Sequence, residues 1–445
     1  MPQSIQGMNV LLIGGGGREH AMAWKLAQSS LLDELYIAPG NPGTVRHGRN
    51  VKLDLKDQKA LRSFLLEKRI RIVVVGPEAP LVDGLHDRIA DDPKLQGIVT
   101  VIGPRAEGAR LEGSKEFAKE FMLRHNIPTA AFRVFGKAEL KEAVEHLDRM
   151  KPPYVIKADG LAQGKGVVIA RDRKEAERAV RDLLGGRFGA ASERIVIEQF
   201  LEGIELSAFL ITDGNAFKML PAAKDYKRIG NGDTGPNTGG MGAVSPAPFA
   251  DRDLLQKVHD RIAAPTIRGL RAEGIRYSGF LFMGLMVVNG DPYVIEYNVR
   301  LGDPETQALL PRLRSDLLDL FEGIASDTLS ERHVDVDDRT CVNVVMAAEG
   351  YPGDVRKGDA IRGIEQVDQA LVFQAGTAAG KDGVVTDGGR VLSVSAFGKD
   401  LEQAIAQVYR QVAIIDFDGK QFRTDIGHDL VRMPAPKQQG APQQV

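Results

Sequence analysis

Apolar runs alternate with helix-like polar stretches over the first hundred residues of the chain. The runs MNVLLI, ELYIA, RIVVV and IVTVI each lead into a turn rich in glycine or proline, namely GGGG, APGN, GPEAPL and IGP. Short apolar strands that alternate with helices are typical of a parallel sheet, in which such turns gather at the carboxyl edge and bind ligands. The pattern therefore predicts a parallel α/β domain at the start of the chain.

Different patterns follow in the middle of the chain. A helix is predicted over Ser114 to His125, because Phe117 and Phe121 fall on one apolar stripe. The run GFLFMGLMVVNGDPYVIEYN is predicted to form a β-hairpin that turns at NGD. From Ala222 to Pro248 no apolar periodicity is present, so we expect a long functional loop of about twenty residues, with a disordered loop as the alternative.

The last hundred residues mix strand and helix patterns. The runs CVNVVMAA, ALVFQAGT and RVLSVSAFG are strand-like, and DLEQAIAQVYRQV is helix-like, but none carries a convincing catalytic pattern. The final MPAPKQQGAPQQV is rich in proline and glutamine and is predicted to be disordered.

Composition narrows the functional classes. A chain of 445 residues is expected to form about three domains. The 58 lysines and arginines nearly balance the 60 acidic residues, which argues against a nucleic-acid or membrane partner. The single Cys341 excludes an internal disulfide. No apolar run is long enough to span a membrane and no cleavable signal is evident, so a cytoplasmic protein is expected.

A candidate metal site follows the predicted hairpin, in the stretch Ile295 to Gln307. Glu296 and Asn298 are two residues apart on a strand, so their oxygen-bearing side chains share one face and suit a hard cation such as Mg²⁺. Arg300 could reach the same region and stabilise a phosphoryl group in transfer. The alternative is an edge strand that carries a surface ion pair.

The four glycines Gly14 to Gly17 form a second candidate site. Their N–H groups and the helix that follows would bind an anion. Nicotinamide binding is disfavoured, because the third glycine position of a dinucleotide fingerprint holds Glu19 or His20. We expect a phosphate-bearing small substrate instead. Glu78 and Asp83, in a later turn, could meet ribose hydroxyls or an amine, or face water as ordinary loop acids.

Lysines and glycines predict a polyphosphate site. Lys157 lies among apolar neighbours in the strand YVIKA, where an unpaired ammonium would be costly and a polyphosphate would supply the missing partner. Lys115, at the start of the predicted helix, is either a phosphate contact or a solvated surface lysine. The loop after YVIKA suits a flap that closes over phosphates. Its candidate contacts are Gly160, Gly164, Lys165 and Gly166.

Two further groups of residues complete the predicted site. Glu198 to Leu201 is expected to be an exposed connector between two strands, whose backbone could pair with an adenine edge while Glu205 faces the ribose. An ordinary hairpin with acidic loop residues is the alternative. Asp225, Lys227 and Arg228, at the head of the long loop, could grip a small zwitterion or a phosphate.

Three long motifs now resemble one known family. VIKADGLAQGKGVVIA, KDYKRIGNGDTGPNTGGMGAVSPAP and VIEYNVRLGDPETQALLPRL are similar to the signatures of the phosphoribosylamine–glycine ligases, which are ATP-grasp enzymes of purine synthesis. The opening VLLIGGGGREHA and the turns APGN and GPEAPLVDG are similar as well. The resemblance runs from about Met8 to about Arg432, and motifs of this length and order do not match by chance.

The resemblance implies a role for each candidate. The metal ligands are expected to be Glu296 and Asn298. Catalytic roles are expected for Arg300, Asp225 and Lys227. ATP contacts are expected from Lys115, Lys157, Gly160, Gly164, Lys165, Gly166, Glu198, Leu201 and Glu205. Substrate contacts are expected from Gly14, Gly15, Gly16, Gly17, Glu78, Asp83 and Asp303.

The resemblance also implies an architecture that is α/β in one part and α+β in the others. A parallel-sheet substrate domain is expected over residues 1–107 and an ATP-grasp core over 108–334, with a small mobile lid at about 128–195. A mixed α+β domain is expected over 335–433, followed by a disordered tail over 434–445.

The activity implied is an ATP-dependent ligation of glycine to 5-phosphoribosylamine through glycyl phosphate, with Mg²⁺ or Mn²⁺ and a monomeric enzyme. Another ATP-grasp carboxylate–amine ligase and a catalytically silent nucleotide-binding protein are the alternatives. The chain departs from the family pattern at Lys224, Tyr226 and Ile204, among other positions. The strand FMGLMVV carries no acid, so a third carboxylate on the metal is not evident.

Overall fold

The computed structural model describes residues 7–162 and 166–433. Its first part is a parallel sheet in the order β3-β2-β1-β4-β5, which confirms the predicted α/β architecture. The strands are β1 (Met8–Gly14), β2 (Leu32–Pro39), β3 (Arg49–Asn50), β4 (Ile70–Val75) and β5 (Thr100–Ile102). The sequence did not predict β3, because a strand of two residues is too short to carry a pattern.

Both faces of this sheet are covered, which explains why its strands read as continuous apolar runs. In β1, Val10 and Leu12 pack with α1 on one face, while Leu11 and Ile13 pack with α2 and α3 on the other. The helices of this part are α1 (Gly17–Leu26), α2 (Gln58–Glu67), α3 (Glu78–Val82), α4 (Leu85–Ala90) and α5 (Ala106–Gly113).

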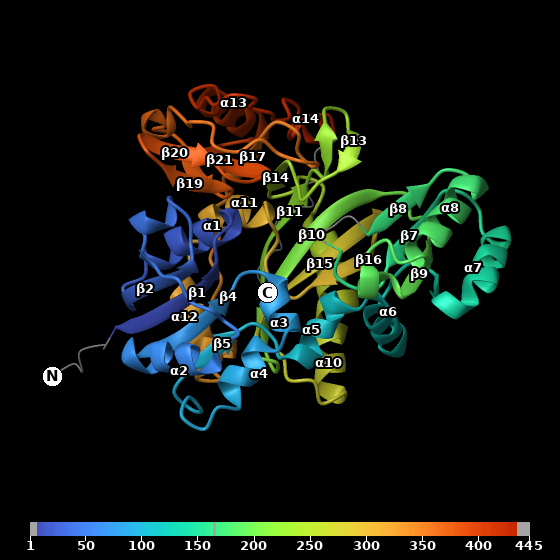
Figure 1. Ribbon diagram of the computed structural model, residues 1–445, viewed down its shortest axis with the longest axis horizontal. Coiled ribbons are helices and arrows are strands. Elements are labelled where there is room, and N and C mark those ends of the chain that lie inside the picture. Colours follow the sequence, from blue (N-terminus) through green and yellow to red (C-terminus); the bar gives the residue numbers. More distant parts are fainter. Residues whose placement is uncertain (1–6, 163–165, 434–445) are drawn as a thin grey trace, which may run out of the picture.

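An antiparallel sheet of eight strands forms the centre of the molecule, in the order β16-β15-β10-β11-β14-β17-β21-β18 (Figure 1). The predicted hairpin is confirmed as β15 and β16, and β16 is an edge strand. The strands of the C-terminal part continue the same sheet through the pairing of β14 with β17. The bounds are β10 (Ile204–Thr212), β11 (Phe217–Asp225), β14 (Gly242–Ser245), β15 (Gly279–Val288), β16 (Asp291–Asn298), β17 (Thr340–Ala347), β18 (Leu371–Gln374) and β21 (Arg390–Gly398).

A second, smaller sheet extends to one side of the molecule and carries α7 and α8 (Figure 1). Its order is β6-β9-β7-β8. The helix α6 precedes this sheet, as predicted, and Ser114 caps it by accepting a hydrogen bond from the Phe117 N–H (3.1 Å). The bounds are α6 (Lys115–Arg124), β6 (Phe132–Gly136), α7 (Leu140–His146), β7 (Tyr154–Ala158), β8 (Val167–Ala170), α8 (Arg173–Leu184) and β9 (Arg194–Gln199).

The prediction of a long loop over Ala222 to Pro248 is wrong. This segment contains the end of β11, a hairpin of β12 (Arg228–Gly230) and β13 (Thr234–Asn237), and β14. These strands have three or four residues and are rich in glycine, threonine and asparagine, so they show no apolar alternation. These strands are held in place instead by pairing with neighbouring strands and by contacts with the C-terminal part.

The C-terminal part packs a helix on its strands. α13 (Leu401–Val412) buries Ala404, Ile405 and Val408 in a core with the strands β17 and β21.

The α-helices and strands of the described residues not yet given are α9 (Arg252–Val258), α10 (Ala264–Ala272), α11 (Glu305–Arg312), α12 (Leu317–Ala325), a hairpin of β19 (Thr377–Gly380) and β20 (Gly383–Thr386), and α14 (His428–Val431). The predicted disordered tail, 434–445, lies outside the described residues.

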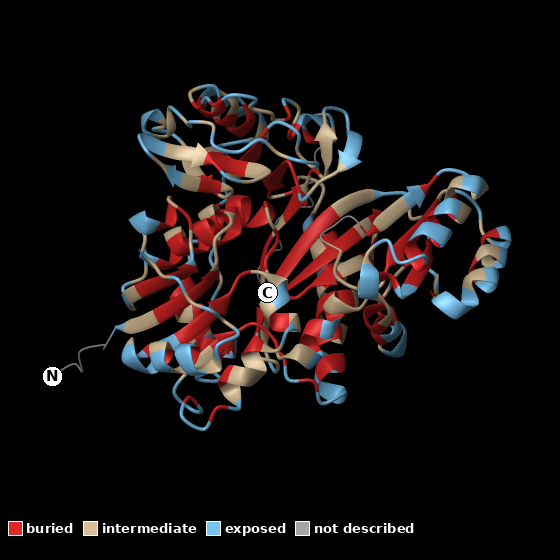
Figure 2. Ribbon diagram, in the orientation of Figure 1, coloured by how far each residue is buried: buried red, intermediate tan, exposed pale blue. Residues whose placement is uncertain are grey.

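Buried residues run continuously through the parallel sheet, the central sheet and the helices between them (Figure 2). Among residues 7–162 and 166–433, no helix has the length and apolar character needed to cross a bilayer.

The core between the parallel and central sheets gives a test of this packing. Phe321 is fully buried and lies edge-on to Phe280, with ring centroids 5.7 Å apart. Phe321→Ala is expected to lower the free energy of unfolding by about 3–5 kcal/mol, because a large cavity replaces the ring. Urea unfolding measures this change. Leu66→Ala, at a side chain that is 39% exposed, is the control and should shift it by less than about 0.5 kcal/mol. Equal effects of the two substitutions would contradict the packing described.

Candidate active site

The end of β16 places Glu296 among four positively charged side chains. Its carboxylate makes no hydrogen bond or ion pair with any described residue, although the residue is half-buried. Burial alone would raise the pKa of Glu296, but nearby positive charges outweigh it and hold the pKa below its usual value. The charges that act on it are those of Lys227, Lys157, Lys115 and Arg300. An ionised carboxylate without a partner in such a place suits a cation held together with an anionic ligand.

Asn298 lies two residues further along the strand and is buried. Its Oδ1 accepts a hydrogen bond from Arg300 Nη2 (2.9 Å), and its Nδ2 has no partner among the described residues. The amide oxygen of Asn298 has a second lone pair and can still bind a cation. Asn298 and Glu296 therefore both offer oxygen atoms, which are the ligands that a hard divalent cation prefers. Within the described residues, no group of three or more His, Cys, Asp or Glu side chains could hold a metal ion.

Arg300 is held by two acids from the N-terminal part. Its Nη2 donates to Glu112 Oε1 (2.7 Å), and its Nε lies 3.3 Å from Glu78 Oε2. Burial would raise the pKa of Glu78, but the charge of Arg300 holds it below its usual value. The alternative of a solvated surface ion pair is wrong for this arginine, because Asn298 and Glu112 are both buried.

Glu112 is a residue that sequence reasoning missed. It lies on α5 and accepts a hydrogen bond from the Val299 N–H (2.8 Å) as well as from Arg300. Burial raises the pKa of Glu112 to about 7, against the opposing charge of Arg300. Its sequence context, an amphipathic helix, gave no signal that it would meet Arg300, since 188 residues separate the two.

Lys157 already has a carboxylate partner, contrary to the prediction. Its Nζ lies 2.9 Å from Glu198 Oε1, and Lys119 Nζ lies 3.0 Å from Glu198 Oε2. All three side chains are buried, so Glu198 is not in an exposed connector but inside β9. The contact between Lys157 Nζ and Glu198 Oε1 is an ion pair without hydrogen-bond geometry, and Lys157 Nζ donates its hydrogen bond to the Ile295 carbonyl (3.3 Å). The carboxylate therefore neutralises two lysines at once.

Lys119 was not predicted, although one signal could have found it. It lies four residues after Lys115 on the same face of α6. Lys115 itself is not a solvated surface lysine, because its Nζ donates to the carbonyls of Asp159 (3.3 Å) and Gly160 (3.2 Å). Burial lowers the pKa of Lys115. These contacts tie the start of α6 to the glycine-rich loop.

The structure describes only part of that loop. The Gly160 N–H donates to the Ala191 carbonyl (2.9 Å), and the Gly166 carbonyl accepts from the Ala158 N–H (2.8 Å). The other two candidate contacts, Gly164 and Lys165, lie outside the described residues.

A second charged group lies on the neighbouring strands β10 and β11. Glu205 forms an ion pair with Lys227, whose Nζ also lies 3.8 Å from Asp225 Oδ2. Burial would lower the pKa of Lys227, but these two acids raise it well above its usual value. Burial raises the pKa of Asp225. Leu201 lies in the connector before β10 and is half-buried.

Glu305, at the start of α11, completes this group and was not predicted to be part of the site. It accepts a hydrogen bond from Ser207 Oγ (3.0 Å), and burial raises its pKa to about 7. Its place in the motif GDPE, two residues after Asp303, was the available signal. The group thus holds more acids than bases, which suits a ligand with an ammonium.

The glycine turn is closed by an acid of the following helix. The Gly16 N–H donates to Glu19 Oε2 (2.7 Å), and Arg18 Nε donates to Oε1 (2.7 Å). Gly14, with φ of +124°, leaves room for this side chain, since a Cβ there would lie 2.4 Å from Glu19 Cγ. The Gly16 N–H, one of the groups expected to bind an anion, is therefore already paired with this carboxylate.

Asp303 faces the glycine turn from the motif GDPE. A Cβ on Gly16 would lie 3.7 Å from Asp303 Oδ2, and Gln307 Nε2 donates to Oδ1 (2.8 Å). Arg390, from β21 of the C-terminal part, lies 3.0 Å from Oδ2. Sequence reasoning missed Arg390, because the run RVLSVSAFG carries no sign of a binding role.

Asp83 is not brought to this place by any contact. It follows α3, its side chain is exposed, and its carbonyl accepts a hydrogen bond from Arg88 (2.6 Å). Among the described residues its carboxylate has no partner. Gly15 packs against the Gly40 carbonyl of the next turn, and Gly17 packs against Gln307.

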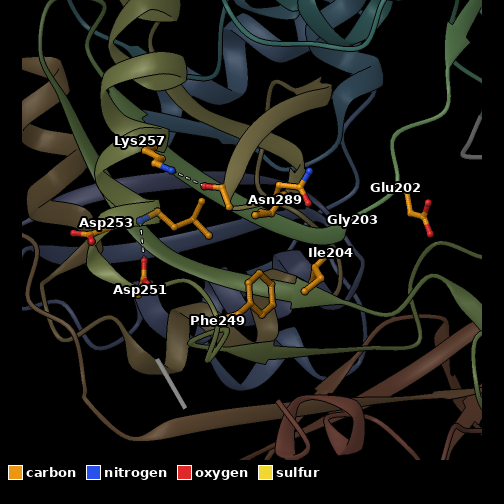
Figure 3. Close-up of a pocket in the computed structure, with 11 residues that line it drawn as sticks. Glu202, Gly203, Ile204, Phe249, Asp251, Asp253, Lys257 and Asn289 are labelled. Atoms are coloured by element: carbon orange, nitrogen blue, oxygen red, sulfur yellow. Dashed lines mark hydrogen bonds between the residues drawn. The ribbon is translucent and has the colours of Figure 1, made fainter. Parts of the chain in front are cut away.

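A cavity of about 670 Å³ lies on the face of β10 opposite to the charged group of Glu205, Asp225 and Lys227 (Figure 3). Ile204 lines it together with Phe249, whereas Glu205, the next residue of the strand, points to the charged group. The departure from the family pattern at Ile204 therefore belongs to this cavity and not to the charged site.

Comparisons with known proteins agree over almost the whole chain. The three domains of phosphoribosylglycinamide synthetase match in order: the N domain over residues 8–112, the ATP-grasp (A) domain over 113–306 and the C domain over 341–429. The phosphoribosylamine–glycine ligase of Yersinia pestis is 47% identical over 431 residues, which are 95% of this chain and 99% of that protein.

Solved structures show the same relation. The phosphoribosylamine–glycine ligase of Thermotoga maritima superposes with a TM-score of 0.80 and 37% identity, over 94% of this chain and 100% of that one. Biotin carboxylase from Campylobacter jejuni superposes with a TM-score of 0.70 over 97% of this chain and 96% of that one. At 14% identity, the second likeness is one of fold alone.

The raised pKa of Glu112 predicts a pH dependence of stability. Between its ordinary value of 4.5 and about 7, the folded protein binds more protons at this group than the unfolded chain does. Its contribution to the free energy of unfolding is therefore fully present below pH 4.5 and is lost as the pH rises to 7, at up to about 1.4 kcal/mol per pH unit. Glu112→Gln removes this dependence, so its profile should be flatter in that window.

Urea unfolding at several pH values between 4.5 and 8 measures both profiles. Glu331→Gln, at an exposed glutamate, is the control and should run parallel to the unsubstituted protein. Parallel profiles for Glu112→Gln as well would show that Glu112 stays ionised across the window.

Proposed function

Because the chain belongs to the phosphoribosylamine–glycine ligase family, we propose that it is an ATP-dependent ligase of purine biosynthesis that joins glycine to 5-phosphoribosylamine. The products are glycinamide ribonucleotide, ADP and phosphate. The observation that carries the proposal is the match of all three family domains, in order, around one continuous charged site. A different ATP-grasp ligase is the second candidate, and the 47% identity to the phosphoribosylamine–glycine ligase of Yersinia pestis favours the first.

ATP is proposed to bind between the two antiparallel sheets. Lys115, Lys157 and the loop from Gly160 to Gly166 would contact its phosphates, and the connector at Leu201 would contact adenine. Glu205 would contact the ribose, and Lys227, which pairs with Glu205, would then contact the nucleotide as well. Lys157 would turn from Glu198 toward a phosphate, and Lys119 would keep Glu198 neutralised when it does.

Glu296 and Asn298 would hold a divalent cation, Mg²⁺ or Mn²⁺, together with the ATP phosphates. Such a cation neutralises the charge on the phosphates as one of them is transferred. The biotin carboxylase domain of the 2-oxoglutarate carboxylase of Hydrogenobacter thermophilus has a similar fold, with a TM-score of 0.69 at 16% identity, and was solved in complex with magnesium ADP, which supports the proposal of a divalent ion.

The reaction proceeds in two steps, and the chain supplies charge to both. In the first, the glycine carboxylate attacks the γ-phosphate, the bond to ADP breaks, and glycyl phosphate forms. Arg300 contacts Asn298, one of the two proposed metal ligands, and would stabilise the phosphoryl group. Asp225 and Lys227 would bind the ammonium and the carboxylate of glycine. In the second, the amine of phosphoribosylamine attacks the carbonyl carbon, phosphate leaves, and the amine nitrogen loses a proton.

The amine substrate is proposed to bind at the carboxyl edge of the parallel sheet, at the turn Gly14 to Gly17. Glu78 and Asp303 both face this region and could meet ribose hydroxyls or the amine. Arg300 contacts Glu78 and therefore connects the amine site to the phosphoryl site. Asp83 stays a prediction, since its exposed carboxylate is not in contact with these groups.

Other predictions stay open to test. We propose domains at 1–107, 108–334 and 335–433, a lid at about 128–195 that moves over ATP, a cytoplasmic location and a monomer. Near-equal numbers of acidic and basic residues support a protein without nucleic-acid or membrane partners.

ADP release tests the function. With glycine, Mg-ATP and freshly made phosphoribosylamine, sustained release is expected, and leaving out any one substrate should remove it. Release that does not depend on phosphoribosylamine would favour another carboxylate–amine ligase. No release with any substrate would favour a silent nucleotide-binding protein.

Glu296→Ala tests the proposed metal site of Glu296 and Asn298. It is expected to lower turnover by on the order of a thousandfold, because the proposed cation loses its charged ligand, while the fold persists. Asp291→Ala is the matched control on the same strand, since that carboxylate pairs with Lys257 at the far end of β16. Circular dichroism and steady-state kinetics measure fold and turnover. An active Glu296→Ala enzyme would remove the metal assignment.

A further inference from the structure

The segment from Lys224 to Gly240 carries Asp225 and Lys227, and side chains of the C-terminal part contact it at three places. At its start, Lys224 Nζ lies 2.9 Å from Asp429 Oδ2. At the β12–β13 turn, Asn231 Nδ2 donates to Thr424 Oγ1 (2.7 Å). At its end, Gly239 is held most completely.

Both polar groups of the Gly239 backbone are fixed by the C-terminal part. The Gly239 N–H donates to Tyr351 Oη (2.9 Å), and its carbonyl accepts from Arg390 Nη1 (2.5 Å). Tyr351 is set close to Arg390, because its ring lies against Gly389, where a Cβ would be 2.3 Å from Cδ2. A loop residue with both groups bound to side chains of another part has little freedom to move.

Arg390 also fixes the motif that faces the glycine turn. It donates to the Asp303 carbonyl (2.6 Å) and pairs with the Asp303 carboxylate (3.0 Å). Gly240 then packs on Pro304, since a Cβ at Gly240 would lie 2.3 Å from Pro304 Cδ. One guanidinium thus joins the two loops and orients the carboxylate that lies beside Gly16.

We propose that Tyr351 and Arg390 are positioning residues for the amine substrate, and that the C-terminal part selects the amine by joining Gly239 to Asp303, whose carboxylate lies beside the glycine turn. The inference rests on the proposed function. A carboxylate in this place recognises ribose hydroxyls or an amine, and its usefulness depends on its orientation. The hydrogen bonds and ion pair of Arg390 within the described residues go to Gly239 and Asp303 and not to the proposed phosphate and metal contacts Lys115, Lys157, Glu296 or Asn298.

The substrates should therefore respond differently. In Arg390→Met, the KM for phosphoribosylamine is expected to rise about tenfold or more, while the KM for ATP stays within about twofold. Arg390→Lys keeps one charge-assisted contact to Asp303 and should recover part of the loss. Tyr351→Phe removes a single hydroxyl, which keeps the test sound if Arg390→Met folds poorly, and should raise the same KM about threefold to tenfold.

Asn231→Ala is the matched control. It removes another contact between the same segment and the C-terminal part, but at the β12–β13 turn, and should leave all three KM values unchanged. Steady-state kinetics with each substrate varied in turn give the result.

Equal rises in every KM, a fall in kcat alone, or an effect of Asn231→Ala as large as that of Tyr351→Phe would overturn the inference. If the unsubstituted enzyme shows no turnover that depends on phosphoribosylamine, the proposed function itself fails, so the two failures are distinguishable.

Discussion

Buried charges must be paired, and this constraint organises the candidate site. Three cations of the candidate site already have a carboxylate partner: Glu198 for Lys157, Glu205 for Lys227 and two glutamates for Arg300. Glu296 is the exception, since it is ionised without a direct partner. In the proposed function, ligand binding would exchange these partners, and the polyanion and the cation would enter together. Such a site stays stable when empty and still offers strong charges to a substrate.

The constraint also explains what sequence reasoning could find. Strand and helix patterns with four or more apolar positions predicted the parallel sheet, α6 and the β15–β16 hairpin. Glycine-rich motifs pointed to the phosphate site because their composition is unusual in itself. The segment from Ala222 to Pro248 failed, since its short strands are ordered by neighbours and not by a local pattern.

Partners distant in the sequence could not be predicted. Lys157 was expected to lack a counter-charge, but Glu198 lies on the adjacent strand, in a register that the sequence does not display. Glu112 and Arg390 reach the site from opposite ends of the chain, where each looks like an ordinary helix or strand residue. The departures at Lys224 and Tyr226 also acquire a physical reason, because both side chains contact Asp429 of α14.

The continuous central sheet affects how the protein is made. β14 pairs with β17, yet roughly a hundred residues separate them in the chain. At ribosomal rates, β14 waits about 5–20 s for its partner, with the hydrogen-bonding groups of one edge unpaired. β14 has only four residues, which limits how well a second nascent chain could pair with it. Strand shortness at this junction thus protects the growing chain from its neighbours on the polysome.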